Sequence, residues 1–77
     1  MDEKLRQRII VDPAVMVGKP VIKGTRIMVS NILSLLGGGY SLKQILEYYP
    51  ELAEADVKEA IQYAVAAVED EEIRLVP

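Results

Sequence analysis

The sequence contains no cysteine and no histidine. Without cysteine the chain has no disulfide, no thiolate metal site and no thiol nucleophile. Without histidine it lacks the commonest general base and the commonest ligand of transition metals. Phenylalanine and tryptophan are absent too, so four tyrosines are the only aromatic residues. We therefore expect a protein that is not an enzyme and has no catalytic residues, no metal site and no cofactor.

Long hydrophobic runs are also missing. The longest apolar stretches, at 32–36 and 64–68, are far shorter than the roughly 20 residues that span a membrane. The chain has 77 residues, of which 51% are hydrophobic and 27% are charged. These proportions are typical of a globular protein, and the length allows one domain. We expect a soluble, cytoplasmic protein in which residues 1–77 form a single domain.

Residues 1–29 are predicted to be extended. The β-branched run at 8–12 predicts a short strand that Pro13 ends. The segments 20–23 and 26–29 flank Gly24-Thr25, which predicts a hairpin with a two-residue type II′ turn. The alternative is two irregular extended arms that lie on a helical core.

Residues 30–72 are predicted to form a core of three helices. Ser30 is the expected N-cap of a helix over 31–36, which the glycines at 37–39 end. Ser41 and Gln44 have the spacing of a capping box, and Pro50 stops the second helix. This second helix has one apolar stripe, made of Leu42, Ile45, Leu46 and Tyr49.

The third helix is predicted over 54–70. Its expected buried face consists of Val57, Ile61, Ala64, Val65 and Val68. The face expected to point away from the core consists of Lys58, Glu59, Gln62, Ala66 and Glu69. Ala53 stands where a capping Ser, Thr or Asp is expected. The fold class is thus mainly α, a tri-helical helix-turn-helix domain with a short N-terminal β-strand and β-hairpin.

The chain resembles the domain-of-unknown-function family 433 from about residue 9 to residue 67. The segments that carry the resemblance are 9–13, 18–26, 29–30, Gly39, 49–52, 56–57 and 60–61. The run Gly18-Lys19-Pro20 to Gly24-Thr25-Arg26 is the most specific part. The resemblance implies a homeodomain-like helix-turn-helix fold and a VapB-like antitoxin encoded beside a small PIN-like nuclease toxin. Ala53 departs from the family pattern, which often has a capping Thr there.

Charge is divided unevenly along the chain. The total is -3, but residues 1–40 carry six bases and three acids, whereas residues 41–77 carry three bases and nine acids. The third helix begins with Glu54, Asp56 and Glu59, which is unfavourable for contact with phosphates. Gly18-Lys19 lacks the other residues of a phosphate-binding loop and is interpreted as a turn before a strand. The candidates for binding nucleic acid or a partner are Lys19, Lys23, Arg26, Arg8 and Lys58, with Lys4 and Arg6 in the same basic segment.

The leading hypothesis is an antitoxin-like interaction module that binds a PIN-like nuclease. Operator DNA is a possible second partner, and a homodimer is expected because operators are symmetric and the monomer core is thin. The alternative is a stand-alone helix-turn-helix transcriptional regulator. An enzyme that works with Asp, Glu, Lys and Tyr is the third reading.

Overall fold

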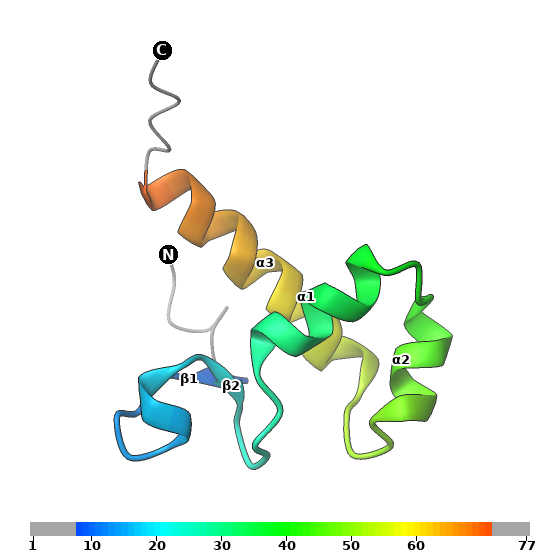
Figure 1. Ribbon diagram of the computed structural model, residues 1–77, viewed down its shortest axis with the longest axis horizontal. Coiled ribbons are helices and arrows are strands. Elements are labelled where there is room, and N and C mark those ends of the chain that lie inside the picture. Colours follow the sequence, from blue (N-terminus) through cyan, green and yellow to red (C-terminus); the bar gives the residue numbers. More distant parts are fainter. Residues whose placement is uncertain (1–7, 72–77) are drawn as a thin grey trace.

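The computed structural model describes residues 8–71, which form three helices and a small β-sheet (Figure 1). The strands are β1 (Ile9–Ile10) and β2 (Val21–Ile22), and a short turn, η2 (Met16–Gly18), lies between them. The helices are α1 (Val29–Gly37), α2 (Leu42–Tyr48) and α3 (Glu54–Glu71). The predicted mainly helical fold with a short N-terminal β-structure is confirmed. No helix in the described part of the chain is long and apolar enough to cross a membrane.

The strands β1 and β2 pair antiparallel, with Ile9 opposite Ile22 and Ile10 opposite Val21. On its other side β2 continues into the predicted hairpin, in which Val21 forms a bridge with Met28. The turn differs from the prediction, because the amide of Thr25 donates to the carbonyl of Ile22 over 2.9 Å. Gly24 is therefore the third residue of the turn, and its φ of 81° is the positive value that a type II turn requires there.

The helix α1 begins at Val29, two residues earlier than predicted. Met28 is its N-cap and makes no side-chain capping bond, while Ser30 lies inside the first turn. The predicted glycine end is confirmed, since Gly39 has a φ of 98°. The amides of Gly39 and Tyr40 donate to the carbonyls of Leu36 and Leu35, which is the hydrogen-bond pattern of a Schellman motif.

The capping box of α2 is also confirmed. The Ser41 hydroxyl accepts from the Gln44 amide over 3.1 Å, and the Gln44 side chain accepts from the Ser41 amide over 2.9 Å. Ile45 is fully buried, and the other members of the predicted stripe pack around it. Two local hydrogen bonds thus fix where α2 begins, and its apolar stripe fixes which face it buries.

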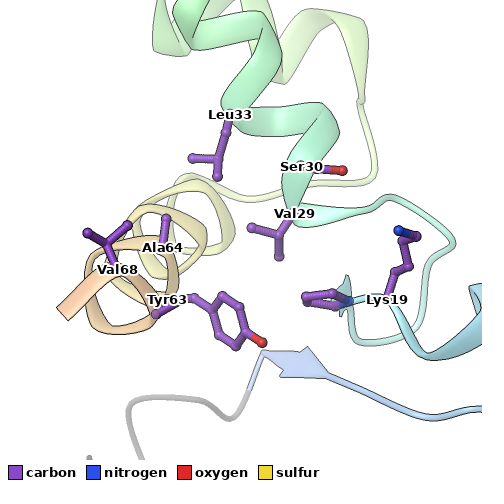
Figure 2. Close-up of a pocket in the computed structure, with 9 residues that line it drawn as sticks. Lys19, Val29, Ser30, Leu33, Tyr63, Ala64 and Val68 are labelled. Atoms are coloured by element: carbon purple, nitrogen blue, oxygen red, sulfur yellow. The ribbon is translucent and has the colours of Figure 1, made fainter. Parts of the chain in front are cut away.

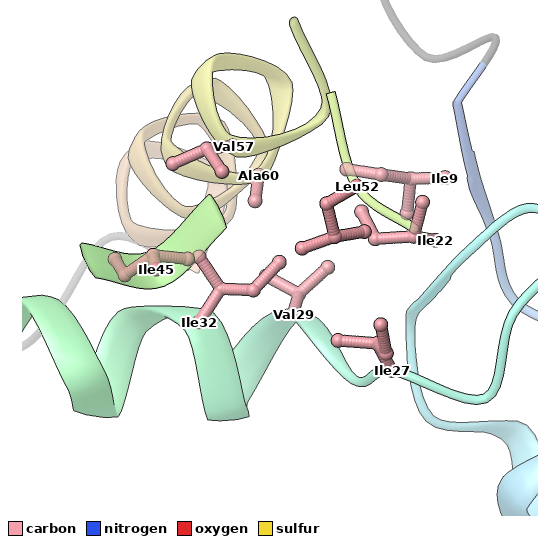
Figure 3. Packing of buried hydrophobic residues seen from close by; sticks show 9 residues of the cluster. All are labelled: Ile9, Ile22, Ile27, Val29, Ile32, Ile45, Leu52, Val57 and Ala60. Atoms are coloured by element: carbon pink, nitrogen blue, oxygen red, sulfur yellow. The ribbon is translucent and has the colours of Figure 1, made fainter. Parts of the chain in front are cut away.

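The core lies where α1 crosses α2 and α3, and the sheet covers its other end (Figure 3). Figure 3 shows Ile32 of α1 between Ile45 of α2 and the Val57–Ala60 side of α3. The strands add Ile9 and Ile22. Each fully buried aliphatic side chain of this kind stabilises a fold by about 1.5–3 kcal/mol. The three helices therefore depend on one small cluster of branched side chains.

The predicted orientation of α3 is wrong in part. Val57 is buried as expected, but Ile61, Val65 and Val68 are exposed. Conversely, Glu59 and Ala66 are buried although they were expected to point away from the core. Apolar residues occupy a wider arc of α3 than its neighbours cover, so hydrophobic spacing alone does not determine which part of that arc is buried.

Three consecutive residues in η2 have positive φ. The values are 50° for Met16, 58° for Val17 and 78° for Gly18. A left-handed conformation costs an L-residue roughly 1–2 kcal/mol, and a β-branched side chain adopts it rarely. The Val17 side chain is 88% exposed, so burial offsets little of this cost.

We expect Val17→Gly to raise the free energy of unfolding by about 1 kcal/mol, because glycine removes the left-handed strain and little packing is lost. Urea denaturation followed by circular dichroism measures the change. Val11→Gly is the control, since Val11 is also exposed but has no positive φ. A Val17→Gly protein that is less stable than the parent would contradict the assignment of strain.

Candidate functional site

The three basic residues of the hairpin segment are all exposed. Lys19 lies between η2 and β2, and Lys23 and Arg26 lie on either side of Gly24-Thr25. None of the three forms an ion pair with a carboxylate of residues 8–69, the part of the chain whose side chains the structure describes. Their charges are therefore available to an anionic partner. Lys4 and Arg6, which belong to the same predicted basic segment, lie outside the described residues.

Arg8 differs from these residues because its charge is already paired. Its Nη1 lies 3.1 Å from Oδ1 of Asp56, and its backbone amide donates to Oε2 of Glu59 over 3.0 Å. The guanidinium is about half exposed, whereas the Asp56 side chain is nearly buried. Arg8 thus attaches the N-terminal strand to α3, and its capacity to bind an external anion is reduced.

Asp56 replaces the missing N-cap of α3. Its Oδ2 accepts from the backbone amide of Ala53 over 2.8 Å. In a capping box, the side chain of the third helical residue accepts from the backbone amide of the N-cap residue, and Asp56 makes this bond to Ala53. The reciprocal bond cannot form, because alanine has no capping hydroxyl. A carboxylate in the first turn is also favoured by the helix dipole. The acids at the start of α3 therefore hold the fold together, and two of them, Asp56 and Glu59, are buried.

Lys58 lies on the exposed side of the same helix. Its Nζ is 3.3 Å from Oε2 of Glu54, one turn earlier, and both side chains are mostly exposed. Such a pair stabilises a helix by only about 0.3–0.5 kcal/mol. Lys58 is thus far from the hairpin bases in sequence. It pairs with Glu54, an acid of its own helix.

An apolar groove of about 340 Å³ lies between the start of α1 and the C-terminal half of α3 (Figure 2). Figure 2 shows Val29 and Leu33 of α1 facing Tyr63, Ala64 and Val68 of α3. We call this the α1–α3 groove. It is lined by Lys19, Pro20, Val29, Ser30, Leu33, Tyr63, Ala64, Ala67 and Val68.

Sequence reasoning missed this groove. Lys19 was singled out for its charge, but Leu33 and Ala67 were not, and Ala64 and Val68 were assigned to the core. The small side chains of Ala64 and Ala67 leave the space that the groove occupies. An alanine pair on an apolar helix face was the only available signal, and it is equally typical of close helix packing.

Comparison with known proteins gives the family. Residues 9–64 match the model of a family described as "Protein of unknown function (DUF433)". This chain belongs to the DUF433 family. A crystal structure of a DUF433 member from Anabaena variabilis superposes with a TM-score of 0.78 at 28% identity, covering 91% of this chain and 69% of that one. The uncharacterized protein y4eO of Sinorhizobium fredii is 31% identical over 61 residues. That match covers 79% of this chain and 28% of y4eO.

The lining of the α1–α3 groove combines apolar side chains with two polar groups. The groove offers an apolar surface with the ammonium of Lys19 and the hydroxyl of Ser30 among its lining residues. In the described residues no three acidic side chains gather into a group that could hold a metal ion. An apolar groove with one cationic side chain suits an aliphatic or aromatic side chain of a partner that carries a carboxylate nearby.

We expect Asp56→Ala to lower the free energy of unfolding by about 2 kcal/mol, because it leaves the Ala53 amide and the Arg8 guanidinium without their acceptor. Asp56→Asn keeps an acceptor oxygen for the Ala53 amide and is expected to cost less. Arg8→Ala removes a half-exposed charge and is expected to cost about 0.5 kcal/mol. Thermal or urea unfolding ranks the three variants. If Arg8→Ala costs as much as Asp56→Ala, the ion pair rather than the cap is the main contribution of Asp56.

Proposed function

We propose that this protein is an antitoxin-like interaction module that binds a PIN-like nuclease toxin through the α1–α3 groove. The observation that carries the proposal is the groove itself, an apolar surface beside the core that is flanked by Lys19, whose ammonium has no ion pair within residues 8–69. Apolar surface with a charged margin is typical of surfaces that bind proteins.

The charges on α3 support a protein partner over DNA. In a helix-turn-helix arrangement α3 would be the helix that enters the major groove. Its first two turns carry Glu54, Asp56 and Glu59 against the single base Lys58, and Lys58 is paired with Glu54. Further along, the exposed face of α3 is aliphatic. Neither part provides the cationic surface that phosphate contacts require.

The identity of the partner comes from the resemblance. Members of the family that look like VapB antitoxins are encoded beside a small PIN-like nuclease, and the resemblance covers most of this chain. An antitoxin needs a surface that recognises its toxin, and we assign this role to the α1–α3 groove.

The second candidate function is a homeodomain-like transcriptional regulator that binds operator DNA. Lys19, Lys23 and Arg26 favour it, because they are exposed and form no ion pair with the side chains of residues 8–69. In this reading the hairpin contacts the DNA backbone and α3 does not. Each lost phosphate contact would lower the salt dependence of binding by about one unit of slope.

The test of the nuclease proposal is co-expression with a PIN-like nuclease encoded beside this chain, followed by calorimetric measurement of the dissociation constant. We expect Ala67→Glu to weaken the complex at least tenfold, because it places a charge in the groove. Ala55→Glu is the matched control, since Ala55 is exposed at the other end of the same helix. Lys19→Glu and Lys43→Glu make a second pair.

Three outcomes contradict the proposal. One is the absence of any complex with the nuclease. Another is a complex that Ala67→Glu and Ala55→Glu affect equally. The last is tight binding to operator DNA alone, lost on Arg26→Ala and kept on Lys58→Ala, which would favour the regulator.

A further inference from the structure

A stripe of exposed aliphatic side chains runs along α3 beside the groove. Ile61, Val65 and Val68 are 40%, 52% and 52% exposed, and Ala64 lies between them. We call these four residues the α3 stripe. They stand at positions i, i+3, i+4 and i+7, so they form one continuous face. Figure 1 shows the C-terminal half of α3 extending beyond α1 and α2.

We propose that the α3 stripe is covered by a second copy of this chain, in an antiparallel helix pair with twofold symmetry. The stripe is symmetric about the point between Ala64 and Val65, because Ile61 and Val68 lie equally far from it. In an antiparallel pair Ile61 of one copy therefore packs against Val68 of the other, and Ala64 packs against Val65. Such a self-complementary surface is what a twofold interface requires.

The charges beside the stripe fit the same arrangement. Lys58 and Glu69 are 11 residues apart, which is close to three helical turns, so both lie on the same side of the stripe. Antiparallel pairing brings Lys58 of each copy next to Glu69 of the other. In a parallel twofold pair Lys58 of one copy and Glu69 of the other lie at different heights and on opposite sides of the seam, so this contact does not form. Charge complementarity therefore selects a second, antiparallel copy as the occupant.

The exposed Lys58–Glu54 pair does not prevent this contact. The two side chains are 67% and 56% exposed, so solvent screens their interaction and the ammonium keeps donors for a second carboxylate. Lys58 thus lies between an acid of its own helix and Glu69 of the second copy.

This inference does not rest on the proposed nuclease partner, because self-association is a property of the chain alone. The stripe and the α1–α3 groove share Ala64 and Val68. Ile61 and Val65 line only the stripe side, whereas Ala67 lines only the groove. Substitutions at Val65 and at Ala67 therefore test the two surfaces separately.

Sedimentation velocity over a range of concentrations up to about 0.5 mM measures the dimer dissociation constant of the full chain. We expect the parent to dimerise and Val65→Glu to be monomeric, because two carboxylates would meet at the centre of the symmetric interface. Val11→Glu makes the same change at a residue of nearly equal exposure, 54%, away from the stripe, and should leave the dimer unchanged. Circular dichroism confirms that each variant is folded. A monomeric parent, or a dimer that resists Val65→Glu, overturns the proposal.

Charge reversal tests the antiparallel register. Lys58→Glu and Glu69→Lys should each weaken the dimer about tenfold, because each substitution occurs twice in a symmetric interface. The double variant Lys58→Glu/Glu69→Lys should recover most of the lost affinity. Additive losses in the double variant would overturn the antiparallel pairing, since they would show that the two residues do not face each other. Glu54→Gln is the control for the pair within the helix.

Discussion

The carboxylate of Asp56 joins parts of the chain that are 48 residues apart in sequence. One oxygen accepts from the Ala53 amide and fixes the first residue of α3, and the other accepts from the Arg8 guanidinium and holds β1. Glu59, one turn later, accepts from the Arg8 amide. The rotation of α3 about its own axis follows from these bonds, because they require the side with Asp56 and Glu59 to face inward. The exposed aliphatic side is the consequence of this rotation.

The same bonds affect which of the charges along the sequence are available on the surface. The basic N-terminal part and the acidic C-terminal part meet at Arg8, whose guanidinium pairs with Asp56 and whose backbone amide donates to Glu59. What remains exposed is a smaller basic group on the hairpin, Lys19, Lys23 and Arg26. This group adjoins the groove only through Lys19. An anionic partner therefore meets isolated charges beside an apolar surface.

Features governed by neighbouring residues were predictable from the sequence, whereas those governed by distant contacts were not. The capping box at Ser41 and the left-handed glycine after α1 involve residues a few positions apart, and both are confirmed. The N-cap of α1 and the buried side of α3 depend on what the hairpin and β1 cover, so Ser30 and Glu59 were placed wrongly. The hairpin bases are exposed in the structure, and their role in binding stays a prediction. The groove was not predicted, because it is a gap between two helices rather than a property of either one.

The two surfaces proposed on α3 are physically coupled, because Ala64 and Val68 belong to both. A second copy packed on the stripe covers part of the wall of the groove. A partner that reaches deep into the groove must then either contact the second copy or compete with it. The small side chain of Ala64 favours the first possibility, since it lets two helix backbones approach closely and leaves the Leu33 and Ala67 side of the groove open.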